Sequence, residues 1–179
     1  MPSLSRIFAS ALLLAAPAAF AQSTATAANV SATARIYVPI SLAKSADLSF
    51  GDVFTGATSS TVTLDPQSST RTVTGDATLA STGAFNAASF TVSGKRNATY
   101  AITLPADNTI SLSGAGTAMP LSKFTASVNG TAATGTATGL LPNTAGASQT
   151  FTVGATLTLG ANQTDGDYLG KFDVMVAYN

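Results

Sequence analysis

Apolar and polar residues alternate with a period of two along most of the chain, which is the pattern of half-buried β-strands. The longest alternating runs are Val30–Ile40, Phe151–Leu159 and Tyr168–Tyr178. Shorter runs are Leu48–Phe50, Val62–Leu64, Thr72–Thr74, Phe90–Val92, Tyr100–Leu104, Ile110–Leu112 and Phe124–Val128. After residue 21 no window repeats apolar residues at helical spacing. The pattern predicts an all-β sandwich of antiparallel strands.

Turn-forming residues separate these runs. They are Asp65-Pro66, Gly94-Lys95, Pro105–Asn108, Asn129-Gly130 and Asp165-Gly166-Asp167. The Asn-Gly pair predicts a tight hairpin. The stretch Gly130–Ser148 is small and polar, so we expect a long flexible loop or a weak edge hairpin there.

The first 21 residues have the composition of a secretory signal peptide. Arg6 is followed by an apolar run, Ile7–Phe20, and Ala19-Phe20-Ala21 is a small-x-small cleavage site. The apolar run is shorter than a bilayer requires, so we expect an exported chain that starts at Gln22 and has no transmembrane anchor. We therefore divide the sequence into a signal peptide (1–21), an N-terminal extension with a candidate donor strand (22–40) and a β-sandwich domain (41–179).

The composition removes several classes of function. The chain has no His, no Cys, no Trp and no Glu, and only 9% of its residues are charged. Zinc fingers, haem and iron–sulfur sites, cysteine proteases and Ser-His-Asp triads are excluded. A formal net charge of zero gives no electrostatic footprint for nucleic acid. We expect a protein that is not an enzyme and has no cofactor.

Two short motifs have the residue types of a functional site, but a structural role is the better interpretation of both. Asn162, Asp165 and Asp167 could hold a weak Ca²⁺, but Asp and Gly between two strands are expected for turn geometry. Ser41 and Lys44 have a Ser-x-x-Lys spacing, but the companion motifs of the serine β-lactamases are missing. We therefore predict no metal site and no catalytic residues.

The two ends of the predicted mature chain carry the strongest alternation, and we expect the last strand to be held in a sheet. The first strand can pair in its own sheet or add to the sheet edge of another subunit, and the sequence leaves both open. The candidate strand-exchange interface consists of Val30, Ala32, Ala34, Ile36, Val38, Ile40, Gly166, Tyr168, Phe172, Val174, Val176 and Tyr178.

The same ends resemble exported bacterial pilins of the chaperone–usher class, in which a Gly stands fourteenth from the end and a Tyr is penultimate, as Gly166 and Tyr178 do here. The run Ala34–Val53 (ARIYVPISLAKSADLSFGDV) resembles the start of a bacterial secreted family, domain of unknown function 4402, itself similar to spore coat protein U domains. Residues Phe90–Gly94, Gly154–Leu157 and Gly170–Val174 fit the same family. The resemblance implies an incomplete immunoglobulin-like, pilin-like sandwich. The disulfide of many spore-coat-U-type pilins cannot be present, because this chain lacks Cys.

These observations predict a structural exported surface protein, a pilin-like or fimbrial subunit that assembles by β-strand exchange. Its expected partners are other subunits of the same or a related type, with a periplasmic chaperone as a further possibility. The alternative is a self-contained secreted β-sandwich that binds a carbohydrate or a host surface through loops such as Gly130–Ser148.

Overall fold

The computed structural model describes residues 24–26 and 29–179. The predicted signal peptide lies outside the described residues. By its internal contacts the chain divides into two units, Met1–Arg35 and Ile36–Asn179, and the strands of the described residues all belong to the second. They are β1 (Ser41–Ala46), β2 (Val53–Phe54), β3 (Ser60–Leu64), β4 (Arg71–Thr74), β5 (Thr78–Leu79), β6 (Ala88–Ser93), β7 (Thr99–Thr103), β8 (Ile110–Leu112), β9 (Met119–Val128), β10 (Thr131–Thr134), β11 (Thr136–Leu140), β12 (Ser148–Leu159) and β13 (Met175–Tyr178).

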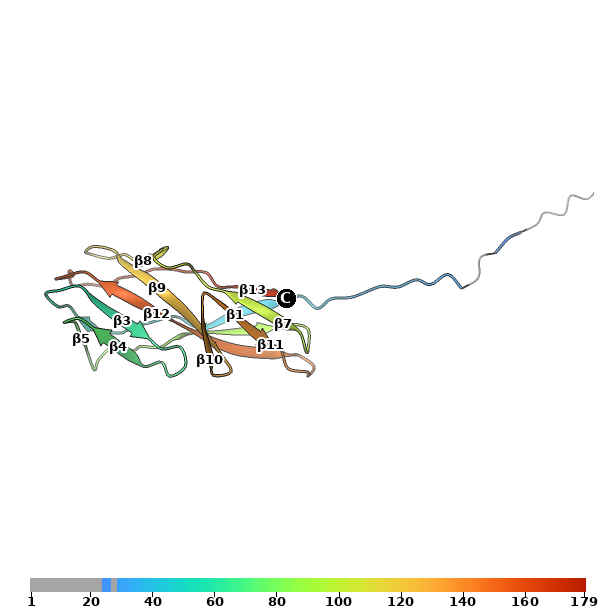
Figure 1. Cartoon of the computed structure of the whole chain (residues 1–179), viewed down its shortest axis with the longest axis horizontal. Coiled ribbons are helices and arrows are strands. Elements are labelled where there is room, and N and C mark those ends of the chain that lie inside the picture. Colours follow the sequence, from blue (N-terminus) through green and yellow to red (C-terminus); the bar gives the residue numbers. More distant parts are fainter. Residues whose placement is uncertain (1–23, 27–28) are drawn as a thin grey trace, which may run out of the picture. The chain divides into compact units, whose positions relative to one another are not determined.

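Strand β12 is the centre of an eight-stranded antiparallel sheet (Figure 1). One of its edges pairs with β9. Its other edge is shared, because β6 pairs with the first half of β12 and β3 with the second half. Strands β1 and β4 extend this side, and β8 and β10 both pair with β9. The order leaves β1, the first strand of the chain, at an edge of the sheet.

The middle of β12 is buried on both faces, which explains its small residues. All residues from Val153 to Leu157 are buried. A Cβ on Gly154 would lie 2.1 Å from the carbonyl oxygen of Leu64, so only glycine fits there. The hydroxyl of the buried Thr156 is satisfied by Thr63 at 2.9 Å. Ala and Thr therefore serve here as close-packing core residues.

A second sheet has the order β11-β7-β13. Its central strand contributes Tyr100, which is fully buried and donates a hydrogen bond from Oη to Gln149 Oε1 at 2.7 Å. Burial raises the pKa of Tyr100 to about 12. Gly139 on β11 lies over this ring, because a Cβ there would be 2.3 Å from Tyr100 Cζ. The two sheets enclose the apolar core, so the prediction of an all-β, immunoglobulin-like sandwich is confirmed.

The hairpin predicted at Asn129-Gly130 is confirmed. Both residues have positive φ, 49° and 76°, as a type I′ turn requires, and Thr131 pairs with Val128. The flexible loop expected over Gly130–Ser148 was wrong. Strand β10 forms the weak edge hairpin, and after Gly135 (φ 77°) the chain crosses to the second sheet as β11. Its buried positions, Ala137 and Gly139, are too small to be recognised as a strand pattern.

The two ends of the sequence pattern form less regular strand than predicted. The last strand is held in a sheet as expected, but only Met175–Tyr178 pair with β7. From residue 161 to residue 174 the one ladder contact is the bridge of Leu169 with Ser113. Residues 29–40 lie in no strand, and pairing begins at Ser41. The N-terminal segment thus has a strand pattern but forms no strand in the described structure.

Candidate functional groove

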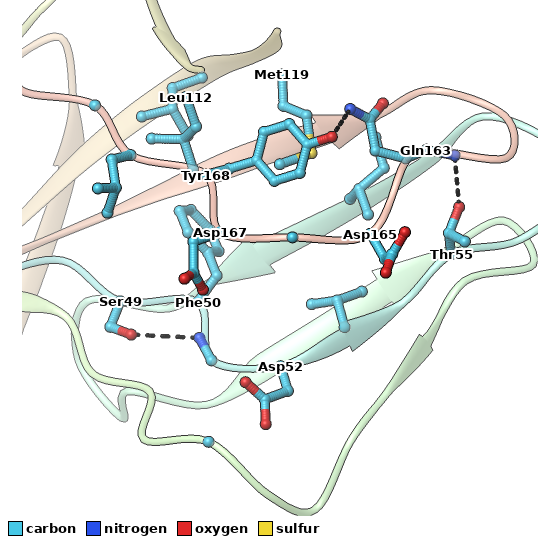
Figure 2. A pocket seen from close by; sticks show the side chains of 18 of the residues that line it. Ser49, Phe50, Asp52, Thr55, Leu112, Met119, Gln163, Asp165, Asp167 and Tyr168 are labelled. Carbon is cyan, nitrogen blue, oxygen red and sulfur yellow. Dashed lines mark hydrogen bonds between the residues drawn. The ribbon is translucent and has the colours of Figure 1, made fainter. Parts of the chain in front are cut away.

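An open groove of about 600 Å³ runs between two segments that lie next to the first and last strands (Figure 2). One wall is residues 48–55, which follow β1, and the other is residues 163–172, which precede β13. The walls meet at one end, where the amide of Asn162 donates to the carbonyl of Gly56 at 2.8 Å. At that end Gln163 N also donates to Thr55 Oγ1 at 2.9 Å. We refer to this site as the terminal groove.

The floor of the terminal groove is the core of the sandwich. Buried Phe50, Met119, Leu121 and Leu159 line it. Half-buried Leu112, Tyr168 and Phe172 complete it, and the ring of Phe172 lies 5.1 Å from that of Phe124. The groove therefore has an apolar floor that is continuous with the core.

Large apolar side chains also stand on the rim. Phe54 on one wall is 65% exposed, and Leu169 on the other is 78% exposed. Charged residues or Pro usually protect sheet edges, so exposed Phe and Leu beside an apolar groove are unusual for a sheet edge that faces solvent.

The first wall is fixed by Arg71. Its Nη1 donates to the carbonyls of Phe50 at 2.7 Å and Asp52 at 3.1 Å, and its Nη2 donates to that of Ala80 at 2.8 Å. The guanidinium also lies 4.0 Å from the ring centre of Phe85. These contacts hold the wall by its backbone, so its position is fixed before any ligand binds.

The second wall is fixed by Tyr168. Its hydroxyl donates to the carbonyl of Thr164 at 2.8 Å and accepts from Gln163 Nε2 at 2.9 Å (Figure 2). Gly166 has φ 133°, a conformation that favours glycine, and Gly114 is required because a Cβ there would meet the Tyr168 ring at 2.9 Å. The bend predicted at Asp165–Asp167 is thus part of the groove wall.

The N-terminal residues of the strand-exchange hypothesis are largely exposed. Val30 is 79%, Ile36 92% and Val38 52% exposed, and Ala32 and Ala34 are exposed as well. Ile40 differs, because it packs against the core of its own chain.

Tyr178 anchors the base of this segment. Its hydroxyl donates to the carbonyl of Val38 at 3.0 Å and accepts from Lys95 N at 2.7 Å. A side chain at Gly94 would collide with this hydroxyl, because its Cβ would lie 2.3 Å away. The anchor marks Val38 as the point where the segment joins the sandwich.

Of the predicted C-terminal residues, Gly166, Tyr168 and Phe172 line the terminal groove. Val174, Val176 and Tyr178 pack against the core instead. The sequence reasoning missed the opposite wall and the floor. The adjacent apolar pairs Val53-Phe54 and Tyr168-Leu169 could have indicated them, since neighbours in an extended chain point to opposite faces.

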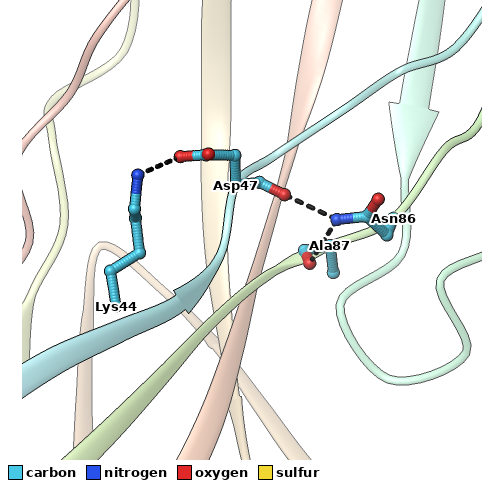
Figure 3. A network of polar contacts seen from close by, with 4 residues as sticks. All are labelled: Lys44, Asp47, Asn86 and Ala87. Atoms are coloured by element: carbon cyan, nitrogen blue, oxygen red, sulfur yellow. Dashed lines mark hydrogen bonds and ion pairs between the residues drawn. The ribbon is translucent and has the colours of Figure 1, made fainter.

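The other sequence candidates have structural roles. Lys44 forms an ion pair with Asp47, whose carbonyl accepts from Asn86 Nδ2 at 2.6 Å, and this network joins the end of β1 to the chain before β6 (Figure 3). Ser41 Oγ donates to the carbonyl of Ser93. In the described part of the chain, no three acidic side chains gather closely enough to hold a metal ion. No helix there has the length and apolarity needed to cross a membrane.

One carboxylate outside the groove is strongly hydrogen-bonded. Asp76 accepts from Thr58 Oγ1 at 2.7 Å, from Thr58 N, and from Ser60 Oγ at 3.2 Å. The Thr58 hydroxyl is the main reason that the pKa of Asp76 is lowered, with desolvation opposing it. The interaction fixes the loop whose Gly56 carbonyl joins the two groove walls.

A family model described as Domain of unknown function (DUF4402) matches residues 40–178. The match covers the sandwich, including both walls of the terminal groove. Searches of curated proteins and of solved structures find no match.

Proposed function

We propose that this chain, which belongs to the DUF4402 family, is an exported structural subunit that assembles by β-strand exchange, as pilins do. The observation that carries the proposal is the presence in one chain of an open apolar groove and of a segment that has a strand pattern but lies in no strand. The donor is the segment Val30–Val38 of one copy, and the acceptor is the terminal groove of the next.

Shape and chemistry support this pairing. A strand added to a sheet edge gains affinity from backbone hydrogen bonds and specificity from pockets for alternate side chains. The terminal groove is bounded by backbone that pairs little with the rest of the chain, since residues 170–174 lie in no ladder. Val30, Ala32, Ala34, Ile36 and Val38 form the single apolar face that such a groove accepts.

The resemblance to spore coat protein U domains and chaperone–usher pilins supports the same proposal, and the predicted signal peptide agrees with an exported subunit. The loop-based binding alternative is weakened, because residues 131–140 form β10 and β11 in place of a long loop.

Two variants of the chain beginning at Gln22 test the proposal by complementation. The donor variant carries Ala34→Asn and Ile36→Asn, and the groove variant carries Phe54→Asn and Leu169→Asn. All four positions are exposed, so the sandwich itself should fold unchanged. Ser31→Asn with Thr33→Asn, on the opposite face of the donor segment, is the matched control.

The wild type and the control should form a ladder on an unboiled denaturing gel that collapses to monomer on boiling. Neither lesion variant should form the ladder alone. Their mixture should give a one-to-one complex, because the groove variant still supplies a donor and the donor variant still supplies a groove. A ladder from either variant alone, or no complex from the mixture, would refute strand exchange.

A further inference from the structure

The rim of the terminal groove is acidic. Asp52 on one wall and Asp165 and Asp167 on the other line it (Figure 2), and no Lys or Arg is among its lining residues. All three carboxylates are exposed, and none has an ion pair or hydrogen bond with a described residue. Near Asp52 the guanidinium of Arg71 binds the backbone and partly offsets the charge. The second wall therefore carries two rim carboxylates, Asp165 and Asp167, against one on the first wall.

The donor segment has the complementary charge. From Gln22 to Ala43 the one charged residue is Arg35. In sequence it lies between Ala34 and Ile36, which belong to the apolar face, so Arg35 belongs to the opposite face of an extended strand. When the apolar face enters a groove, Arg35 points outward.

The two rim carboxylates of the second wall are exposed at the mouth of the groove. Tyr168 is half-buried against the floor, whereas Asp165 and Asp167, which precede it, are exposed and line the groove. Residues facing each other across neighbouring strands have Cβ atoms about 4.5–5.5 Å apart, and diagonal neighbours are within reach of a long side chain. An Arg on the added strand can therefore reach either carboxylate.

We propose that Arg35 of one copy pairs with Asp165 and Asp167 of the next, and that this pairing sets the register of the exchanged strand. The inference rests on the proposed strand exchange. The apolar face alone repeats every two residues, so a slip by two positions would still place apolar side chains in the groove. A single charge on the outer face restricts the slip to the registers that bring Arg35 within reach of these carboxylates, and only the central one places it near both.

The test uses the chain beginning at Gln22 in three forms: Arg35→Glu, Asp165→Lys with Asp167→Lys, and all three changes together. The association constant is measured by sedimentation at about 20 mM and about 500 mM NaCl, where exposed charges are respectively felt and screened. Thr136→Lys with Thr138→Lys, added to Arg35→Glu, is the control for net charge. Both Thr are exposed on β11, outside the groove lining.

At low salt Arg35→Glu should weaken association by about two- to fivefold for each lost pair, and more through repulsion. The form that combines Arg35→Glu with Asp165→Lys and Asp167→Lys should restore association, whereas Arg35→Glu with the two lysines on β11 should not. High salt should remove these differences. Equal association of all forms at low salt, or equal rescue by the β11 lysines, would overturn the pairing. If association then still requires Ile36, strand exchange itself stands; if Ile36 is also dispensable, both proposals fail.

Discussion

Replacing Ile36 with Ser separates the stability of the sandwich from the stability of the assembly. Ile36 is 92% exposed in the single chain, so its side chain contributes almost nothing to the folded monomer. In the proposed exchange it becomes buried in the groove of the next copy. Full burial of an Ile side chain stabilises by about 1.5–3 kcal/mol, and nearly all of that remains to be gained.

The loss corresponds to roughly a 10- to 150-fold decrease in the association constant at each junction, since 1.4 kcal/mol is about a factor of ten. The melting temperature of the monomer should change by less than about 1 °C, because exposed substitutions rarely alter stability. Thr33→Ser removes one methyl group from the opposite face of the same segment and should leave association within about a factor of two.

Sedimentation velocity over a range of concentrations measures the association constant, and thermal unfolding of dilute protein measures the monomer. Association of Ile36→Ser equal to the wild type would refute the assignment of Ile36 to the groove. A similar loss with Thr33→Ser would show that the segment binds without a preferred face. A lower melting temperature of Ile36→Ser would mean that the residue supports its own domain.

Three further substitutions test the interactions that shape the groove and its surroundings. Asp76→Asn should lower the melting temperature at neutral pH. Because the pKa of Asp76 is lowered in the folded state, the difference in melting temperature between wild type and variant should vanish as the pH falls below the ordinary value of 3.8. Thermal melts at successive pH values measure this difference. Gly154→Ala should destabilise by about 1–3 kcal/mol in urea unfolding through its clash at 2.1 Å, while Gly160→Ala, which meets only the end of a flexible side chain, should cost under about 0.5 kcal/mol. Tyr178→Phe loses the hydrogen bond to Val38 and should lower the backbone order parameters of residues 36–40 in NMR relaxation.

The alternating pattern predicted the strands whose side chains meet a large apolar core. Strands β3, β6, β7 and β12 have large apolar residues such as Val62, Phe90, Ile102 and Leu157 at alternate positions, and each strand overlaps the run that the pattern predicted. Strand β11 was missed because its inward residues are Ala137 and Gly139. Their burial depends on the Tyr100 ring from β7, a contact that no local pattern of β11 reveals.

The groove could be only half predicted for a similar reason. Periodicity tells which face of a strand is apolar, but it does not tell which partner covers that face. Residues 30–40 alternate as cleanly as β12, yet they pair with no described strand. The floor is built by Leu112, Leu121 and Leu159, which come from three strands, and it stays open because the two walls leave their sheets before closing over it.

The order of the strands indicates why the proposed assembly would be open-ended. Strand β1 ends one sheet and β13 ends the other, and the two groove walls are the segments that follow β1 and precede β13. The donor segment and the groove are different surfaces, and a contact between different surfaces is heterologous. A dimer joined by one such contact leaves a donor and a groove free. Each added copy covers one groove and presents another, so a filament results unless the rotation between successive copies closes a ring. The two ends of such an assembly differ, because one presents an uncovered groove with exposed Phe54 and Leu169 and the other presents a free donor segment, so the assembly has a direction.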